Sequence, residues 1–328
     1  MIIETKGGMQ MTRYVAGLDV GGTSGRVKIA GVDGSEIGEY YGLGCSINTA
    51  GRTRSEAVYR ELVLAALHEF DLSPEGCRGI CIAASGVDSP ELEQLCREIF
   101  IGMGFAESAV IVQNDCEIFL NLPGNPSLVL IAGTGSICYG RTGSKEVFRS
   151  GGWNHILSDE GSAFGIGLDV LRHAGNHLDG REFCPVLCRG VQEKTGAGSL
   201  YDLDRYVNDN LMDKGIIGGF ASLAEQSFQA GEPAGAAVLD RAANDLFLLV
   251  RDTCRKMGLG EEDKFSLWLW GSVLLKCLPL RTGAEHLLTG CYPEISIKVP
   301  PQTALEIALH VALSRAGIQE GQSDAIKI

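Results

Sequence analysis

The sequence contains no apolar segment of the roughly 18 residues that a membrane-spanning helix needs, so we expect a soluble protein without a membrane partner. Positive charge is also scarce, with 28 Lys and Arg against 41 Asp and Glu and a formal net charge of -13. Nucleic-acid binding depends on clustered Lys and Arg, so the composition argues against a nucleic-acid partner. A phosphate-bearing ligand would have to be held by local groups rather than by the overall charge.

Cysteine pairs with the spacing of zinc or redox motifs are missing too. The closest pairs, Cys77 with Cys81 and Cys184 with Cys188, have three intervening residues rather than two. The eleven cysteines are an odd number, and residues 1–12, which we expect to be a flexible lead-in, lack the charged-then-apolar pattern of a signal segment. We therefore expect reduced thiols, no structural zinc and a cytoplasmic location.

The order of elements in the first part of the chain predicts an α/β domain. Residues 14–20 are a short apolar run, residues 21–24 read Gly-Gly-Thr-Ser, and residues 26–30 alternate with period two. This pattern indicates a β-hairpin with a glycine-rich turn. The segments that follow predict a third strand after the Asp33-Gly34 turn, a helix over 56–69 and a buried strand over 79–84.

The same opening returns in the second part of the chain. Residues 127–132 are again an apolar strand, residues 133–136 a small-residue turn, and residues 137–141 an outgoing strand. Such self-similarity indicates an internal repeat of two copies, and 328 residues exceed the usual size of one core, so we expect two domains. Residues 121–126, which carry Pro and Gly, form the expected hinge. The other expected elements are helices over most of 199–258, a strand over 265–270 and a helix after it.

Both hairpin turns have a composition that suits phosphate binding. Glycines beside hydroxyl residues let backbone N–H and side-chain O–H groups approach phosphate oxygens without an intervening Cβ. Either turn alone is more often a simple tight turn, but two at equivalent points of a repeat favour a polyphosphate site. Neither is a Walker loop, since no Lys follows the glycines, and neither opens a helix as a dinucleotide motif does. The phosphate-binding candidates are Gly21, Gly22, Thr23, Ser24, Gly133, Thr134 and Gly135.

Two aspartates near strand ends are the candidate acidic groups. Asp19 precedes the first turn, where its carboxylate could hold Mg²⁺ through water or, alternatively, stabilise the turn. Asp115 ends the apolar strand that starts at Val110 and precedes an expected helix. The carboxyl ends of parallel strands face the ligand crevice of an open sheet, which suits a catalytic base. A helix N-cap is the other interpretation, and position alone does not separate the two.

The densest polar cluster lies between Gly151 and Ser162, and places an aromatic ring, an imidazole and two carboxylates between glycines. Carbohydrate hydroxyl groups require convergent donors and acceptors of this kind, and Trp153 can offer a face to a sugar ring. We assign His155 a structural role. Gly271-Ser272, at the end of another apolar strand, would let adenine or ribose approach the backbone, or would simply form a turn.

Taken in order, these motifs resemble the N-acetylglucosamine kinase and benzoyl-CoA-reductase-activator ATPase family within the sugar kinase, actin and heat-shock ATPase superfamily. The resemblance spans nearly the whole chain. The residues that carry it are Asp19-Val20-Gly21-Gly22-Thr23, Ala84-Ser85-Gly86, Asn114-Asp115, Gly133-Thr134-Gly135-Ser136, Gly152-Trp153, Asp159-Glu160-Gly161-Ser162 and Gly271-Ser272.

This resemblance implies an α/β protein of two ribonuclease H-like domains, of the actin and sugar kinase type, with an ATP and sugar cleft between them. The domains would span 13–120, joined by a C-terminal helix at about 302–317, and 121–301. ATP with Mg²⁺ would be the cofactor, an amino sugar such as N-acetylglucosamine or glucosamine the substrate, and Asp115 the general base. Where the protein assembles, a homodimer is the form to expect. Further implied contacts are Gly218, Gly271 and Ser272 for ATP, and Asn48, Ser85, Asp115, Ser136, Gly152, Trp153 and Asp159 for the sugar.

Some positions depart from the vertebrate-type kinase pattern and leave the identity of the sugar open. These are Ala50, Ser150, Asn154 and Ser158. Another hexose therefore remains an alternative substrate. A different class of function on the same fold is an ATPase that activates a partner reductase through an iron–sulfur cluster, but the cysteines here are scattered or lie in expected strands, as Cys81 and Cys138 do. A sugar-responsive regulator is a third alternative, disfavoured by the acidic charge and the lack of an appended helix-turn-helix.

Overall fold

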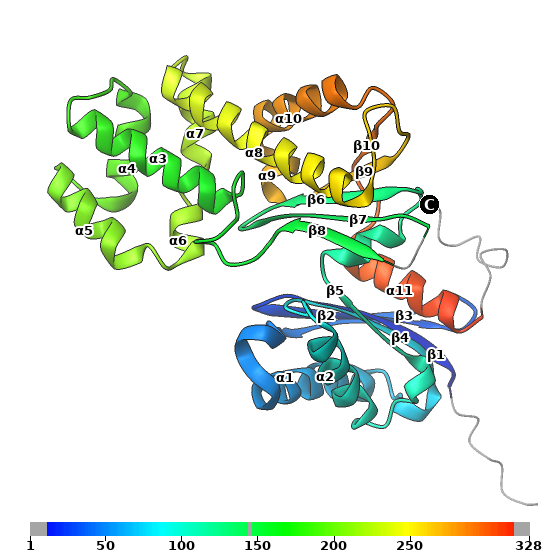
Figure 1. Cartoon of the computed structure of the whole chain (residues 1–328). Coiled ribbons are helices and arrows are strands. Elements are labelled where there is room, and N and C mark those ends of the chain that lie inside the picture. The colour runs from blue at the N-terminus through cyan, green and yellow to red at the C-terminus, as the bar shows by residue number, and fades with distance from the viewer. Residues whose placement is uncertain (1–11, 144–145, 318–328) are drawn as a thin grey trace, which may run out of the picture. The chain divides into compact units, whose positions relative to one another are not determined.

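The computed structural model describes residues 12–143 and 146–317 (Figure 1). Most of the expected lead-in, residues 1–11, lies outside the described residues. The described chain forms two compact units, and each has its own sheet and its own core. Of the described residues, the first unit contains 12–121 and 301–317, and the second contains 122–143 and 146–300.

The first unit contains a five-stranded mixed sheet. Its strands, in spatial order, are β3 (Glu36–Leu43), β2 (Ser24–Gly31), β1 (Tyr14–Val20), β4 (Cys77–Ala84) and β5 (Val110–Asn114). The first three strands pair antiparallel as the expected hairpin and its third strand, and β1, β4 and β5 pair parallel. The carboxyl ends of the three parallel strands therefore meet at one edge of the sheet.

Helices cover both faces of this sheet. Figure 1 shows α1 (Ile47–Glu69) and α2 (Pro90–Ile101) on one face and α11 (Ala304–Arg315) on the other. The backbone of α11 lies very close to β1 and β4, because a Cβ at Gly17 would be 2.3 Å from the amide nitrogen of Leu309 and a Cβ at Gly79 would be 2.3 Å from the carbonyl oxygen of Ala312. The two glycines thus fix where the helix crosses the sheet.

Two expected helices differ from the structure. The helix expected over 56–69 begins earlier, at Ile47, and its path bends at Gly51, where φ is +72°. After Asp115 the chain forms only the short 3₁₀ helix η3 (Glu117–Asn121) instead of an α-helix. The Asn114 side chain accepts hydrogen bonds from the amides of Cys116 and Glu117, and consecutive apolar residues of η3 are all buried, so no amphipathic 3.6-residue pattern develops. The other short 3₁₀ segments are η1 (Pro74–Gly76) and η2 (Glu107–Ala109).

The sheet of the second unit repeats the strand order of the first. Its strands are β8 (Val147–Gly151), β7 (Ser136–Arg141), β6 (Ser127–Ala132), β9 (Ser266–Trp270) and β10 (Ser296–Lys298). Here too three antiparallel strands are followed by parallel ones, with β6 parallel to β9 and β9 parallel to β10. The shared order confirms the internal repeat that the two hairpins predict.

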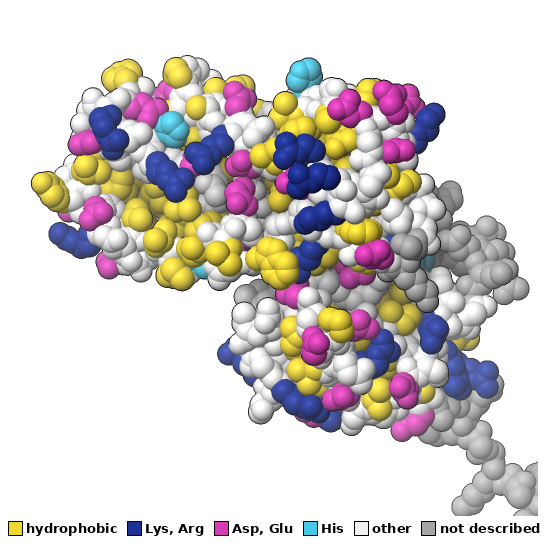
Figure 2. All heavy atoms as spheres, viewed as in Figure 1, with side chains coloured by type: hydrophobic (Ala, Val, Ile, Leu, Met, Phe, Trp, Pro, Cys, Tyr) yellow, Lys and Arg dark blue, Asp and Glu magenta, His cyan; other side chains and the backbone are white. Residues whose placement is uncertain are grey.

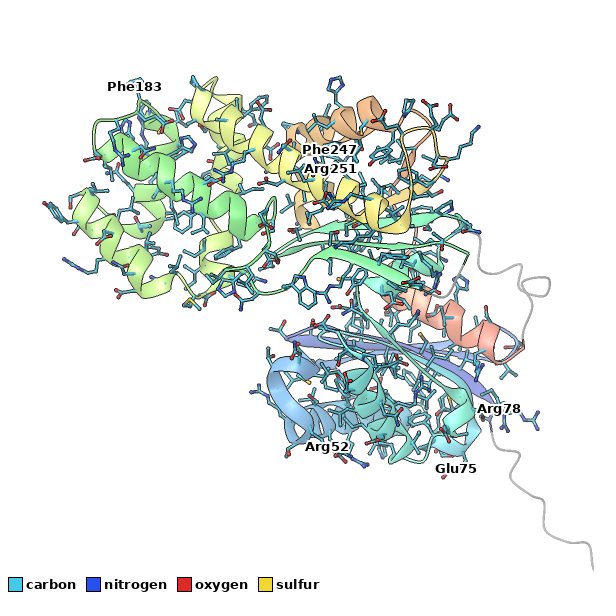
Figure 3. All side chains as sticks on the ribbon, in the orientation of Figure 1. Arg52, Glu75, Arg78, Phe183, Phe247 and Arg251 are labelled. Atoms are coloured by element: carbon cyan, nitrogen blue, oxygen red, sulfur yellow. The ribbon has the colours of Figure 1, made fainter. Side chains whose placement is uncertain are left out.

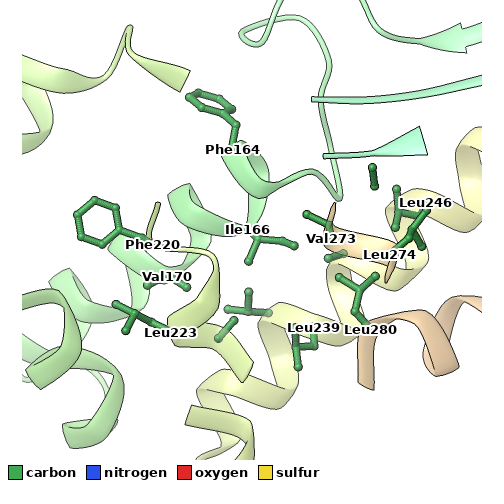
Figure 4. Close-up of a cluster of buried hydrophobic side chains, with 14 of the residues drawn as sticks. Phe164, Ile166, Val170, Phe220, Leu223, Leu239, Leu246, Val273, Leu274 and Leu280 are labelled. Atoms are coloured by element: carbon green, nitrogen blue, oxygen red, sulfur yellow. The ribbon is translucent and has the colours of Figure 1, made fainter. Parts of the chain in front are cut away.

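Helices form the larger part of the second unit. They are α3 (Ala163–Leu178), α4 (Pro185–Thr195), α5 (Leu200–Asn210), α6 (Lys214–Gly218), α7 (Ser222–Gln229), α8 (Pro233–Met257), α9 (Ser272–Lys276) and α10 (Leu278–Cys291). The mainly helical character predicted for 199–258 is confirmed. Figure 4 shows how Phe164 of α3, Phe220 between α6 and α7, and Leu246 of α8 enter one buried apolar cluster. In the described part of the chain, no helix combines the length and apolar character needed to span a membrane.

Candidate functional site

The first glycine-rich turn joins β1 to β2 and is held by backbone contacts. The Gly21 amide donates to the Ser24 carbonyl at 3.0 Å, and the Gly44 amide donates to the Thr23 carbonyl at 3.2 Å. A Cβ at Gly44 would lie 2.3 Å from the carbonyl oxygens of Gly21 and Ser24. The backbone after β3 therefore packs directly against the turn, and only a glycine fits at position 44. Gly22 and Thr23 are exposed and available to a ligand.

Asp19 lies on β1 directly before this turn. Its carboxylate forms an ion pair with Arg26, with 2.5 Å between Oδ2 and Nη2. The two residues face each other in the hairpin register, so the pairing follows from the strand geometry. In the described residues, no group of three or more His, Cys, Asp and Glu side chains is arranged to hold a metal. A single carboxylate beside a phosphate-binding turn suits Mg²⁺, which keeps water and phosphate oxygens as most of its ligands.

Asp115 lies at the carboxyl edge of the parallel strands, immediately after β5. The pKa of its carboxyl group is raised from 3.8 to about 6, mainly by burial and in addition by the negative charges of Asp19 and Asp88, while a hydrogen bond with the Cys116 side chain lowers it. The neighbouring Asn114 donates from Nδ2 to Asp88 Oδ1 at 3.1 Å. Three carboxylates from three successive strand ends thus lie near one another, and Asp115 has the pKa of a base poised close to neutral pH.

Asn48 and Ser85 lie at this same edge of the first unit. The Ile47 amide donates to the Ser85 carbonyl at 3.1 Å, which fixes the start of α1 against the loop that follows β4. Gly86 has a φ of +80°, and a Cβ there would lie 2.9 Å from the Asn48 amide nitrogen. The first unit therefore brings together its predicted sugar contacts, its predicted base and its predicted metal ligand.

The second glycine-rich turn joins β6 to β7 and receives the start of α3. The Gly133 amide donates to the Gly135 carbonyl at 2.9 Å. The Ala163 amide donates to the Gly133 carbonyl at 2.8 Å, and the Phe164 amide to the Thr134 carbonyl at 3.4 Å. Backbone hydrogen bonds therefore join the second glycine-rich turn to the N-terminus of α3.

Gly218, Gly271 and Ser272 lie close to the second glycine-rich turn and to the start of α3. A Cβ at Gly271, where φ is +98°, would be 2.3 Å from the Ala132 carbonyl oxygen. A Cβ at Gly133 would be 4.0 Å from the Ser272 amide nitrogen, and one at Gly218 would be 3.3 Å from Ala163 Cβ. The predicted ATP-binding residues of the second unit thus converge within it.

Asp159 and Ser136, both predicted to contact sugar, bind each other. Asp159 Oδ1 accepts a hydrogen bond from the Ser136 amide at 3.0 Å, and the Ser136 hydroxyl donates to the Glu160 carbonyl at 2.6 Å. Asp159 is 3% exposed, has a φ of +78°, and pairs with Lys214, whose Nζ lies 2.6 Å from Oδ2. A Cβ at Gly135 would lie 2.6 Å from Asp159 Oδ1, so a glycine is needed where the carboxylate reaches the turn.

Trp153 stands apart from this pair, on the exposed loop that follows Gly152. Gly152 has a φ of +69°, which turns the chain after β8. Trp153 is 65% exposed, and the guanidinium carbon of Arg149 lies 3.7 Å from the centroid of its ring. The ring is therefore held in place by a cation–π contact while one side remains open to a ligand.

The structure adds three residues that sequence reasoning did not single out. Arg26 could have been found from the hairpin register, which places it opposite Asp19. Asp88 follows the Ser85-Gly86 motif closely, but its proximity to Asn114 depends on the pairing of β4 with β5. Lys214 is far from Asp159 in the sequence, and no local pattern identifies it as a partner.

Comparison with known proteins gives a match over most of the chain. The model of the BadF/BadG/BcrA/BcrD ATPase family matches residues 16–309. The chain is 29% identical over 287 residues to an N-acetylmuramic acid/N-acetylglucosamine kinase of Clostridium acetobutylicum, a match that covers 87% of this chain and 93% of the relative. It is 28% identical over 302 residues to an N-acetyl-D-glucosamine kinase of Dictyostelium discoideum, covering 85% of this chain and 94% of the relative.

A solved structure shares the fold. A crystal structure from Chromobacterium violaceum, provisionally named an N-acetylglucosamine kinase, aligns with a TM-score of 0.69 at 22% sequence identity. The alignment covers 92% of this chain and 99% of that protein. The two-domain α/β architecture predicted from the motifs is therefore confirmed.

Proposed function

Because the chain belongs to the BadF/BadG/BcrA/BcrD ATPase family, we propose that it is a sugar kinase that transfers the γ-phosphoryl group of ATP to a hydroxyl group of an amino sugar. N-acetylglucosamine is the substrate that the names of both curated relatives share, which makes it the first choice for this chain, with glucosamine second. Asp115 is the observation that carries the proposal: a carboxyl group with a pKa of about 6, at a strand end beside Asn48, Ser85 and Asp19.

The proposed reaction uses Asp115 as a general base. A neutral sugar hydroxyl is a poor nucleophile, and a carboxylate within hydrogen-bonding reach can accept its proton as the oxygen attacks the γ-phosphorus. The bond from phosphorus to the leaving oxygen of ADP breaks, and the proton remains on Asp115. At pH 7, a group with a pKa near 6 is mostly ionised and can accept that proton.

The other predicted residues hold the reactants. We assign the γ- and β-phosphates to the turns at Gly21–Ser24 and Gly133–Gly135, and the nucleoside to Gly218, Gly271 and Ser272. Asn48, Ser85 and Trp153 are assigned to the sugar. Mg²⁺ bound near Asp19 would neutralise charge that develops on the transferred phosphoryl group. In this scheme Arg26 keeps the Asp19 carboxylate oriented.

Ser136, Gly152 and Asp159 have a supporting place in this proposal. The Asp159 carboxylate already binds the Ser136 amide and Lys214. We therefore assign Asp159 and Ser136 a structural role: they hold the second turn and the loop that carries Gly152 and Trp153 in their conformation. A sugar hydroxyl that reached Asp159 would share the carboxylate with these partners.

A screen of ADP release across amino sugars and plain hexoses tests the proposal. N-acetylglucosamine or glucosamine should give the highest kcat/KM, with N-acetylmuramic acid and glucose as comparison substrates. Asp115→Asn should lower kcat at least about a hundredfold, in line with the contribution of general bases. Asp209→Asn, an exposed aspartate in α5, is the matched control and should leave kcat unchanged.

Two outcomes would contradict the kinase proposal. One is substantial turnover by Asp115→Asn with its secondary structure intact. The other is ATP hydrolysis without sugar phosphorylation, together with the absorbance of an iron–sulfur cluster in anaerobically purified protein, which would support the reductase-activator alternative. The buried positions of Cys81 and Cys138, both 0% exposed, disfavour that alternative.

A further inference from the structure

A pocket in the first unit lies at the edge opposite to Asp19 and Asp115. It has a volume of about 560 Å³ and is lined by Arg13, Val32, Arg78, Ser108, Arg315 and Ala316. Its charged lining consists of three guanidinium groups without a carboxylate. In a protein with a formal net charge of -13, such a concentration of positive charge needs a reason.

The fold brings the three arginines together from separate segments. Arg13 precedes β1 and Arg78 is the second residue of β4, and these parallel strands begin side by side, with Tyr14 opposite Cys77. Arg315 ends α11, whose last turns cross β4 where Gly79 lets the Ala312 carbonyl approach. Figure 3 shows Arg78 at the end of the sheet where β1 begins.

Arg315 is oriented by a hydrogen bond. The Nε of Arg315 donates to the Ser108 carbonyl at 3.0 Å, which leaves the terminal nitrogens of its guanidinium group for a ligand. The side chains of Arg13 and Arg78 are exposed. Arg13 and Arg78 form no ion pair with any residue that the structure describes. Figure 2 shows a row of Lys and Arg side chains over the second unit as well, and on the rest of the visible face Lys and Arg are interspersed with Asp and Glu.

Three acidic residues, Glu75, Asp33 and Glu107, are close in sequence to the lining residues, but none of them lines the pocket. Glu75 and Asp33 accept hydrogen bonds from Ser73 and Ser35, which lower the pKa of each carboxyl group. The C-terminal end of α11 carries a partial negative charge of about half a unit, which repels an anion. This repulsion is smaller than the attraction from three guanidinium groups, each with a full positive charge.

We propose that this pocket is a second anion site, distinct from the ATP-binding turns, that binds a small molecule with a multiply charged phosphate group. Guanidinium groups pair with phosphate oxygens through two parallel hydrogen bonds, and three of them match a diphosphate or bisphosphate better than a single phosphate. The volume is within the range of small-molecule sites, on the order of 300–1,000 Å³.

A small ligand fits these observations better than a nucleic acid. Three cations would neutralise only a few phosphates of a polyanion, and the remaining phosphates would meet an acidic surface. The pocket is also far from the proposed catalytic edge, because Arg13 and Asp19 lie at opposite ends of β1, a separation of roughly 20 Å for a strand of this length. The proposal therefore does not depend on the proposed kinase activity.

Calorimetric titration with inorganic pyrophosphate tests this second site. The intact protein should bind pyrophosphate more tightly than inorganic phosphate. Arg13→Ala/Arg78→Ala should weaken one class of pyrophosphate binding at least about tenfold, because it removes the charged hydrogen bonds of two guanidinium groups. Both side chains are exposed, so the double variant should keep its fold and its binding at the glycine-rich turns.

Arg189→Ala/Arg205→Ala is the matched control, because it removes the same charge from exposed positions in the second unit. It should bind pyrophosphate like the intact protein. Equal weakening in both double variants would show a nonspecific effect of net charge and overturn the proposal. So would unchanged binding in Arg13→Ala/Arg78→Ala, or saturable binding of a single-stranded oligonucleotide in place of pyrophosphate. Arg13→Lys/Arg78→Lys should recover only part of the affinity, because lysine keeps the charge and loses the bidentate geometry.

Discussion

The ammonium group of Lys214, in α6, lies 2.6 Å from the carboxylate of Asp159, a residue that is 3% exposed and binds the amide of Ser136 in the second glycine-rich turn. This ion pair connects a helix of the second unit to the turn that we assign to phosphate. A buried carboxylate without its cation is costly, so the pair should stabilise the turn in the geometry that the proposed function requires.

Lys214→Met should lower the free energy of unfolding by roughly 1–3 kcal/mol, less than for a fully buried pair because the lysine is 36% exposed. Urea denaturation measures the loss. Asp159→Asn/Lys214→Met should recover most of it, since neither charge remains. Lys264→Met, which breaks the exposed pair with Glu294, should change stability by less than about 1 kcal/mol. Equal losses in the two lysine variants would contradict a special role for Lys214.

The acid limb of kcat/KM should report the ionisation of Asp115. Because the carboxylate is the active form and its pKa is about 6, activity should fall below that pH. Asp88→Asn removes one of the charges that raise this pKa and keeps the oxygen that accepts from Asn114, so the acid limb should move to lower pH. A pH profile that does not move would exclude coupling between the two carboxylates.

The same raised pKa predicts a cost in stability. The folded protein holds the Asp115 proton more tightly than the unfolded chain does. The protonated carboxyl group is therefore no burden on the folded state below about pH 4, and the free energy of unfolding falls as the pH rises through about 6 and the group ionises. Asp115→Asn should therefore be more stable than the parent at pH 8, by up to roughly 2–3 kcal/mol for a shift of about two units, and the gain should shrink at pH 4. Chemical denaturation at the two pH values measures the difference, and a variant that is less stable at pH 8 would contradict the prediction.

Gly271 should be among the least replaceable glycines of the second unit. Its φ is +98° and an added Cβ would meet the Ala132 carbonyl oxygen at 2.3 Å, so Gly271→Ala combines backbone strain with a clash against β6. Gly196 has a φ of +71° with nothing near an added Cβ, and Gly196→Ala isolates the strain alone, about 1 kcal/mol. We expect Gly271→Ala to cost at least about 2 kcal/mol more and to weaken ATP binding, as measured by denaturation and by nucleotide titration. Similar costs in the two variants would contradict this.

The two hairpins could be predicted because their information is local. Strand alternation and glycine-rich turns identify β1 with β2 and β6 with β7, and the repetition predicts two similar domains. The edge strands β8 and β10 were not predicted, since short strands at the edge of a sheet carry little periodicity. The 3₁₀ helix after Asp115 was predicted as an α-helix, because the hydrogen bonds of Asn114 that shape this segment are not visible in a hydrophobic pattern.

The sequence by itself determined which groups are available: two small-residue turns, Asp19 and Asp115 near strand ends, and an exposed aromatic loop at Trp153. Only the tertiary structure decided what surrounds them. The parallel pairing of β1, β4 and β5 places Asp19 and Asp88 near Asp115 and partly buries its carboxyl group, and both effects raise its pKa. Packing of α6 and α11 brings Lys214 to Asp159 and Arg315 to the pocket of Arg13 and Arg78. Charge interactions depend on distance through space, and distances between remote residues are set by packing rather than by position along the chain.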